Sequence, residues 1–125
     1  MSKSVLIVDD CPFTRRLLSL YLAGEGYELY QAENGLDALE HLARRPADLV
    51  VTDLNMPHMD GLALTRALKT DPAYERIPVV MLSTETAETE RASGIEAGAA
   101  RYLTKPVGRG PLAAEVRALL HEGTV

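Results

Sequence analysis

The sequence predicts an α/β fold in which helices cover a parallel sheet of five strands. Five short apolar segments, at residues 5–8, 27–32, 49–51, 79–82 and 102–103, alternate with longer segments of helical periodicity. Such alternation is typical of βαβ units, which build parallel sheets. The first, third and fourth segments are almost wholly aliphatic, as expected of central strands buried on both faces. The second and fifth are mixed with polar residues, which indicates edge strands.

Helices are expected between these strands because apolar residues recur there every three or four positions. One start signal is clear, since Asn34 followed three residues later by Asp37 resembles a capping box. The segment at residues 84–97 has Ile95 as its only large apolar residue, so we expect this helix to pack weakly. The last helix lacks a strong capping residue, and we expect its start to be displaced to Pro111 or to be mobile.

One compact domain spanning residues 1–125 is expected from the composition, because 46% of the residues are hydrophobic and 25% are charged. A net charge of −5 with no basic run argues against direct binding of nucleic acid. The single cysteine excludes an intramolecular disulfide, and the amino terminus lacks the apolar stretch of a signal peptide. No apolar run approaches the roughly 20 residues of a membrane-spanning helix. We therefore expect a cytoplasmic protein without membrane insertion.

Reactive side chains stand at the ends of four of the predicted strands. The segment VLIV leads to Asp9 and Asp10, DLVVT ends in Asp53, VVML is followed by Ser83, and RYLT is followed by Lys105. All strands of a parallel sheet have their carboxyl ends along one edge, and α/β proteins bind ligands in the crevice there. These five residues are therefore expected to share one site.

The three aspartates predict a cation site, because carboxylates placed together repel one another unless a cation neutralises them. Asp9, Asp10 and Asp53 offer only oxygen ligands, which favours Mg²⁺, or else Mn²⁺, over zinc. Mg²⁺ normally accepts phosphate oxygens, so phosphoryl chemistry is the natural candidate. Lys105 supplies a positive charge and Ser83 a hydroxyl. With a carboxylate nucleophile, these are the parts needed to place a phosphoryl group on Asp53.

Four fragments, VLIVDD, VVTDLNMPHMDG, VVMLS and ARYLTKP, occur in this order along the whole chain. Together they make the sequence resemble the receiver domains of bacterial two-component response regulators, of the single-domain, chemotaxis-regulator-like type. The resemblance implies a doubly wound, flavodoxin-like fold of three layers with strand order 2-1-3-4-5. It implies that Asp53 accepts a phosphoryl group from a sensor histidine kinase or phosphotransfer protein and later loses it by hydrolysis. The chain is then a phosphoacceptor signalling domain that catalyses its own phosphotransfer and dephosphorylation, and not an enzyme in the ordinary sense.

The resemblance also assigns the metal ligands. Asp10 and Asp53 are expected to bind Mg²⁺ directly, and Asp9 to act through water. The backbone carbonyl of Asn55 is expected to be the third protein ligand.

Phosphate binding and switching follow from the same resemblance. Ser83 and Lys105 are expected to contact the phosphoryl oxygens, helped by backbone N–H groups near Asn55 and Thr84. When Ser83 moves toward the phosphoryl group, space opens into which the ring of Tyr102 turns. The bond between Lys105 and Pro106 is expected to be cis, and an X-Pro bond is the only kind for which the cis form is inexpensive.

The switch is expected to act on one face, formed by a helix from Thr89 to Ala97, the strand with Tyr102 and the final helix. An unknown downstream protein would bind there. Candidate contact residues are Arg91, Ile95, Arg101, Tyr102 and Arg117.

Three positions differ from the usual pattern of this family. Ala100 and Arg101 stand where many DNA-binding regulators carry acidic residues that help to pair two receivers, so a monomer is expected here. Thr84 stands where Ala or Gly is usual, and its β-branched side chain is expected to crowd the route to Asp53.

Other functions share parts of this pattern. A flavodoxin-like cofactor binder would have a first loop rich in Ser, Thr and Gly, where Asp9 and Asp10 stand instead. A phosphatase with an aspartyl nucleophile carries that nucleophile on its first strand and needs a substrate cap. A degenerate receiver acting as a constitutive interaction module would lack part of the site. The sequence does not distinguish an output switch from a phosphorelay intermediate. It does not identify the kinase, the target or the pathway.

Overall fold

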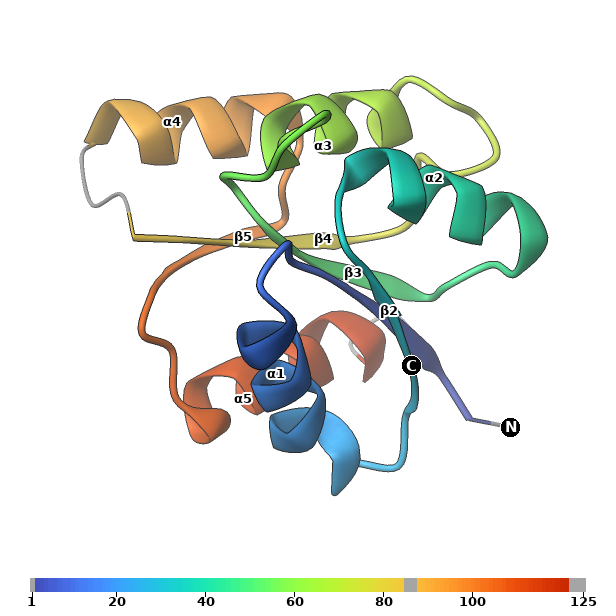
Figure 1. Ribbon diagram of the computed structural model, residues 1–125, viewed down its shortest axis with the longest axis vertical. Helices are drawn as coiled ribbons and strands as arrows, with labels where there is room; N and C mark the ends of the chain where they lie inside the picture. The colour runs from blue at the N-terminus through green and yellow to red at the C-terminus, as the bar shows by residue number, and fades with distance from the viewer. Residues whose placement is uncertain (1, 85–87, 122–125) are drawn as a thin grey trace.

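The computed structural model describes residues 2–84 and 88–121 and has a five-stranded sheet between two layers of helices (Figure 1). The strands are β1 (Ser4–Val8), β2 (Glu28–Ala32), β3 (Leu49–Asp53), β4 (Val79–Ser83) and β5 (Arg101–Thr104), and the helices are α1 (Pro12–Ala23), α2 (Gly35–Arg44), α3 (Gly61–Lys69), α4 (Glu88–Ala97) and α5 (Arg109–His121). All strand pairs are parallel, and the order is β2-β1-β3-β4-β5. The doubly wound α/β fold with strand order 2-1-3-4-5 is confirmed. Within the described residues, no helix is long and apolar enough to cross a membrane.

The composition of each strand follows from its place in the sheet. Every residue of β1 and β4 is buried, and so is every residue of β3 except the last. The outer strands β2 and β5 contain exposed positions. Central strands have neighbours on both sides and helices on both faces, so only apolar side chains avoid a desolvation cost there. The expected division into central and edge strands is confirmed.

Two apolar cores lie on opposite faces of the sheet, and alternate residues of each strand contribute to them. From β1, Val5 and Ile7 pack with the apolar faces of α1 and α5. Leu6 and Val8 pack on the other face, with residues of α2 and α3. In Figure 1, α1 and α5 lie below the sheet, and α2, α3 and α4 lie above it. The sheet edge is thereby held between rigid layers.

The helix boundaries follow from local hydrogen bonds. The side chain of Asn34 accepts a hydrogen bond from the N–H of Asp37 at 2.9 Å, so the expected cap of α2 is confirmed. The expectation that the last helix starts at Pro111 is wrong, because α5 begins at Arg109, whereas the expected mobility of this start stays a prediction. Proline fits in a first turn, where its missing N–H would have no partner within the helix.

Helix α4 packs through small residues. Gly94 and Ala97 are buried, whereas Ile95, its only large apolar residue, is 47% exposed. This agrees with the weak packing expected from the sequence. The side chain of Tyr102 on β5 is buried beneath this helix, in a small cluster with Leu54 and Met81.

Candidate functional site

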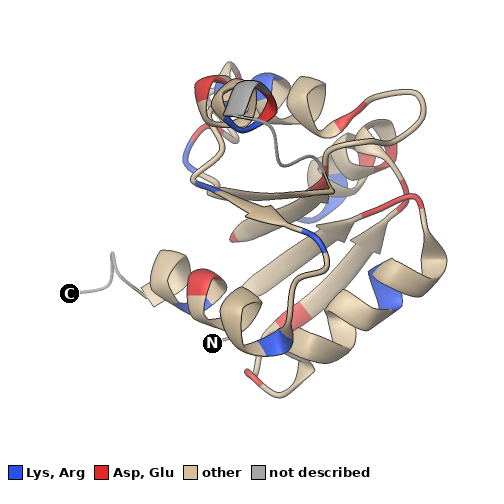
Figure 2. Cartoon of the chain, turned by 90° about the vertical axis from the view of Figure 1, so that its left-hand side faces the viewer, with Lys and Arg blue, Asp and Glu red and all other residues tan. Residues whose placement is uncertain are grey.

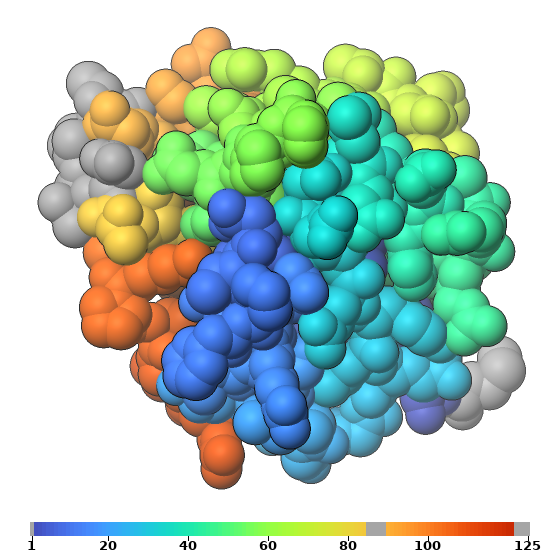
Figure 3. Space-filling model, viewed as in Figure 1, coloured from blue at the N-terminus to red at the C-terminus, as the bar shows by residue number. Residues whose placement is uncertain are grey.

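The register of the sheet aligns the reactive residues along its carboxyl edge. Asp53 pairs with Leu82, the residue before Ser83. Ser83 in turn pairs with Thr104, the residue before Lys105. Figure 3 shows the surface above this edge, where the start of α1 in blue adjoins the segments after β3 in green and after β5 in orange. Segments far apart in the sequence therefore meet at one place.

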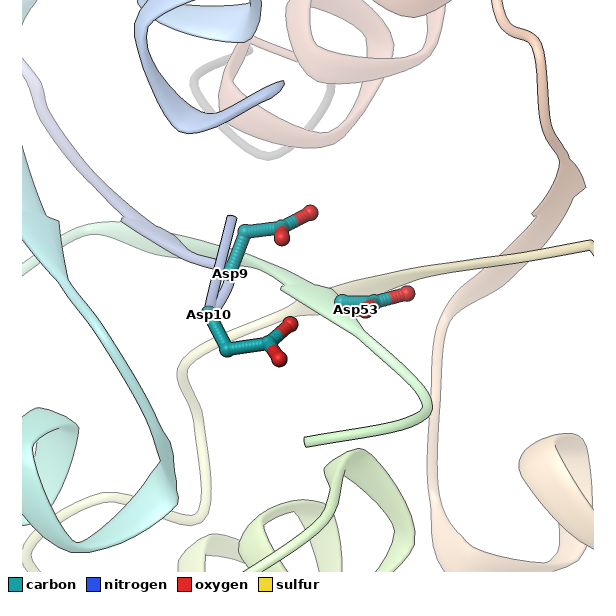
Figure 4. Close-up of side chains that lie close together, drawn as sticks. All are labelled: Asp9, Asp10 and Asp53. Atoms are coloured by element: carbon teal, nitrogen blue, oxygen red, sulfur yellow. The ribbon is translucent and has the colours of Figure 1, made fainter. Parts of the chain in front are cut away.

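The three aspartates converge there as expected. One carboxylate oxygen from each of Asp9, Asp10 and Asp53 lies within 4.8 Å of the others. Figure 4 shows the three side chains directed into the same space. Asp9 is 1% exposed, Asp53 is half-buried and Asp10 is exposed. A cluster of carboxylate oxygens that is open on one side fits a hard divalent cation such as Mg²⁺, which retains part of its water.

Lys105 reaches into the cluster from the end of β5. Its Nζ lies 3.0 Å from Oδ2 of Asp9 and 3.0 Å from Oδ1 of Asp53. Burial raises the pKa of Asp53, the hydrogen bond and charge of Lys105 partly offset this, and the neighbouring aspartates Asp9 and Asp10 add to the rise. Burial opposes the charged ammonium of Lys105, but its bonds to Asp53 and Asp9 prevail and raise the pKa of Lys105. The lysine thus remains charged and compensates two of the carboxylates.

The loop between β3 and α3 closes tightly over Asp53. The N–H of Gly61 donates to the carbonyl oxygen of Leu54 at 2.8 Å. A Cβ on Gly61 would collide with the carbonyl oxygen of Asp53, so a larger residue would displace the loop. Asp60 caps α3 by accepting from the N–H of Ala63 at 2.8 Å. The sequence does not reveal the contact with Asp53, although a glycine directly after a capping aspartate is a signal for a close approach.

Comparison with known proteins agrees with this geometry. Residues 5–117 match the model of the response regulator receiver domain. The chain belongs to this family. It is 41% identical over 119 residues to the response regulator PleD of Caulobacter vibrioides, covering 95% of this chain and 26% of PleD. It is 37% identical over 120 residues to the transcriptional regulatory protein SrrA of Staphylococcus aureus, covering 96% of this chain and 48% of SrrA. The receiver thus spans about a quarter and about half of these relatives.

Solved structures show the same architecture. The chemotaxis response regulator CheY4 of Vibrio cholerae superposes with a TM-score of 0.89 at 32% identity, covering 96% of this chain and all of the other, 100%. The signal receiver domain of a signal transduction histidine kinase from Syntrophus aciditrophicus gives a TM-score of 0.91 at 34% identity, covering 98% of this chain and 92% of the other. The receiver fold of the chain is therefore shared along nearly its whole length.

The remaining residues expected at the receiver site lie around the acidic cluster. Ser83 is fully buried at the end of β4, and Thr84 is exposed directly after it. Thr84 and Lys105 line a hollow of about 320 Å³ beside α1. The bond between Lys105 and Pro106 is cis, as expected. Asn55 lies exposed in the loop after Asp53.

Tyr102 already occupies an inward position in this receiver. Its side chain is 3% exposed. The guanidinium of Arg91 on α4 lies 5.9 Å from the centre of its ring, and Nη1 of Arg91 donates to the carbonyl oxygen of Tyr102 at 3.4 Å. The inward state that the resemblance associates with phosphorylation is therefore sterically accessible in the unphosphorylated chain.

The candidate contact face is less basic than the sequence suggests. Arg101 forms an ion pair with Glu115 at 2.5 Å, so its charge is compensated within the chain. Arg117 forms an ion pair with Glu25, in the loop after α1, at 2.9 Å. This pairing compensates the charge of Arg117 within the chain, and its place among the contact residues stays a prediction. Figure 2 shows basic residues interspersed with acidic ones on the helices.

Proposed function

We propose that this receiver is the phosphoacceptor of a two-component system, in which Asp53 takes a phosphoryl group from a sensor histidine kinase or phosphotransfer protein in a reaction that depends on Mg²⁺, with Mn²⁺ as a substitute. One observation carries the proposal. Three carboxylates lie within 4.8 Å of one another, and the ammonium of Lys105 lies 3.0 Å from two of them. Chains that bring these groups to one sheet edge have the nucleophile and the positive charges that phosphoryl transfer requires.

The chemistry assigns Asp53 the role of nucleophile. A carboxylate oxygen of Asp53 forms a bond to phosphorus while the phosphorus–nitrogen bond of a phosphohistidine breaks. The electron pair of that bond stays on the imidazole nitrogen, which takes up a proton. Water later hydrolyses the acyl phosphate, which restores the carboxylate of Asp53 and releases inorganic phosphate. The ammonium of Lys105, already 3.0 Å from Asp53, compensates the charge of the transferred oxygens.

The acidic cluster would hold the cation, with Asp10 and Asp53 as direct ligands and Asp9 acting through water. The backbone carbonyl of Asn55, in the loop that Gly61 brings close to Asp53, would complete the protein ligands. Bound Mg²⁺ supplies the positive charge that neutralises the carboxylates and phosphoryl oxygens. The choice of Mg²⁺ agrees with the available donors, which are oxygen atoms alone.

Phosphorylation would change the conformation of the face formed by α4, β5 and α5, and this change would alter the affinity of the face for a downstream protein. Ser83 is the last residue of β4, one position beyond the partner of Asp53, so its hydroxyl can move toward a phosphoryl group there. Phosphorylation adds about −1.5 to −2 charge at this point. Tyr102 would then be held inward more firmly, while Thr84 would contribute its backbone N–H to the phosphoryl oxygens.

Incubation of the protein with phosphoramidate and Mg²⁺ tests the proposal. Intact-mass measurement should show one added phosphoryl group, which chelation of Mg²⁺ prevents. Asp53→Asn should abolish the modification, and Asp71→Asn, at the opposite edge of the sheet, should retain it. Equal labelling of Asp53→Asn would overturn the assignment, and the absence of labelling in the wild type would favour a degenerate receiver that serves as an interaction module. Transfer of the label from Asp53 to a histidine phosphotransfer protein would identify a relay intermediate.

A further inference from the structure

We propose that Arg15 is a positioning residue for the divalent cation, because it fixes the peptide group that joins Asp9 to Asp10. The proposal rests on the proposed function, in which these aspartates hold Mg²⁺. The side chain of Arg15 does not bond to the carboxylates of the acidic cluster. It acts instead on the backbone from which both acidic side chains extend.

The side chain of Arg15 bridges two neighbouring strands at their carboxyl ends. Its Nη1 donates to the carbonyl oxygen of Asp9 at 2.7 Å. Its Nε donates to Oε1 of Gln31 on β2 at 3.0 Å. The backbone of Arg15 is itself fixed in the first turn of α1, where its N–H donates to the carbonyl oxygen of Cys11 at 2.9 Å. A planar guanidinium with two directed donors therefore links β1, β2 and α1.

The carbonyl that Arg15 holds belongs to the peptide group whose nitrogen is that of Asp10. A peptide group is planar, so fixing the direction of its carbonyl also fixes the position from which Asp10 starts. The bond is charge-assisted and short, which makes it stronger than an ordinary backbone bond. The orientation of Asp10 therefore depends on Arg15.

The two aspartates differ in how their carboxylates are held. Oδ1 of Asp9 accepts from the N–H of Cys11 at 2.9 Å, and Oδ2 of Asp9 accepts from Lys105 at 3.0 Å. In the part of the chain that the structure describes, no hydrogen bond or ion pair fixes the exposed carboxylate of Asp10. The backbone is thus the main restraint on Asp10, the expected direct ligand. A residue that orders this backbone pre-organises the cation site.

The charge of Arg15 alone would have the opposite effect. A positive charge beside a cation site weakens cation binding by Coulomb repulsion. If Arg15 acted only through its charge, its removal would tighten Mg²⁺ binding. If it positions Asp10, its removal loosens the site, and loss of such an outer partner typically lowers metal affinity 10–100-fold. The sign of the change separates the two explanations.

Arg16 provides a matched control. It follows Arg15 directly, is exposed, and its side chain makes no hydrogen bond or ion pair with any residue that the structure describes. Arg15→Met and Arg16→Met remove the same charge at adjacent positions and retain an unbranched apolar stem. Arg15→Lys keeps the charge but loses the two-donor fork. Gln31→Ala removes the second partner of the fork.

Isothermal titration calorimetry with MgCl₂ on the complete chain measures the effect, and urea unfolding in EDTA checks that each variant is folded. We expect Arg15→Met to weaken Mg²⁺ binding about tenfold, Arg15→Lys and Gln31→Ala to weaken it less, and Arg16→Met to leave it unchanged or slightly tighter. With phosphoramidate as donor, Arg15→Met should raise the Mg²⁺ concentration needed for the half-maximal rate, while the rate at saturating Mg²⁺ changes less than twofold. An affinity for Arg15→Met equal to or above that of the wild type overturns the inference and leaves the proposed function intact. Absence of Mg²⁺ binding by the wild type overturns both.

Discussion

Gly94 lies inside α4, where glycine costs helix stability, and the ring of Tyr102 explains its presence. A Cβ at this position would lie 2.7 Å from Cδ2 and 3.0 Å from Cε2 of Tyr102, and 3.2 Å from Sδ of Met81. The ring is 3% exposed, so it cannot move away without leaving its pocket or displacing α4. Replacement of Gly94 by alanine therefore tests whether the inward ring and the helix are in direct contact.

Two opposing effects set the magnitude for Gly94→Ala. Alanine favours a helix over glycine by about 1 kcal/mol. An extra methyl group in a closely packed site costs about 1–3 kcal/mol. The net expectation is a loss of up to about 2 kcal/mol in the free energy of unfolding. In a Tyr102→Ala background the steric conflict is relieved, and the same substitution should stabilise the protein by about 1 kcal/mol.

Urea unfolding followed by far-UV circular dichroism measures these free energies in all four proteins of the cycle. The coupling between the two positions should be about 1–3 kcal/mol, as found for residues in contact. Gly110 in α5 is the control, because nothing lies within 4 Å of a Cβ built there. Gly110→Ala should have the same effect with and without Tyr102. If Gly94→Ala also has equal effects in both backgrounds, the ring does not rest against α4 and the reasoning is refuted.

Three other outcomes concern the site. Mg²⁺ should raise the melting temperature of the wild type by binding the folded state, and Asp10→Asn should reduce this gain; an equal gain in the two proteins would remove Asp10 from the site. If the exposed side chain of Thr84 crowds the approach to Asp53, Thr84→Ala should speed both phosphorylation by phosphoramidate and loss of the phosphoryl group, whereas unchanged rates would disprove the crowding. With beryllofluoride and Mg²⁺, light scattering after size exclusion should show a monomer at micromolar concentration, and a stable dimer through α4, β5 and α5 would contradict this.

The fold could be predicted from the sequence because burial on both faces constrains composition strongly. The runs at the centres of β1, β3 and β4 are almost wholly aliphatic, and helices with one apolar face lie between them. The strand order itself came from the resemblance to receiver domains, since alternation of strands and helices is compatible with several orders. Helix boundaries were less predictable. The start of α5 at Arg109 depends on the geometry of the preceding loop, and no capping residue in the sequence indicates it.

The site could be predicted where its residues sit directly at strand ends. Asp9, Asp10, Asp53 and Lys105 converge because parallel strands share an edge, and the measured distances agree. Contacts made by the backbone or across helices could not be predicted. Arg15 is one of two adjacent arginines on α1, and nothing in the sequence tells which of them turns back to the carbonyl of Asp9.

Charged surface residues were the least predictable part. The contact residues expected from the sequence include three arginines, and the structure pairs two of them with acidic residues, Arg101 with Glu115 and Arg117 with Glu25. Glu25 and Arg117 are 92 positions apart in the chain. The packing of helices determines which long charged side chains come within reach of one another, here through the contact of α1 with α5. A charge count along the sequence contains no information on that packing.

Lys105 connects the resting site to the proposed phosphorylated one. In the structure its ammonium lies between Asp9 and Asp53, 3.0 Å from an oxygen of each, so the lysine compensates charge before any phosphoryl group arrives. Transfer to Asp53 replaces a carboxylate by a group of higher negative charge, and the same ammonium can pair with the new oxygens by a small rotation of its flexible chain. Its interaction with Asp9, which the N–H of Cys11 holds in place, need not be broken. In the proposed switch the group that moves is Ser83, which is fully buried at the end of β4 and pairs with Thr104 of β5, so its displacement would change the packing against β5. A lysine that only rotates slightly and a serine that is displaced would confine the structural change to the β4–β5 side, where Tyr102 and α4 lie.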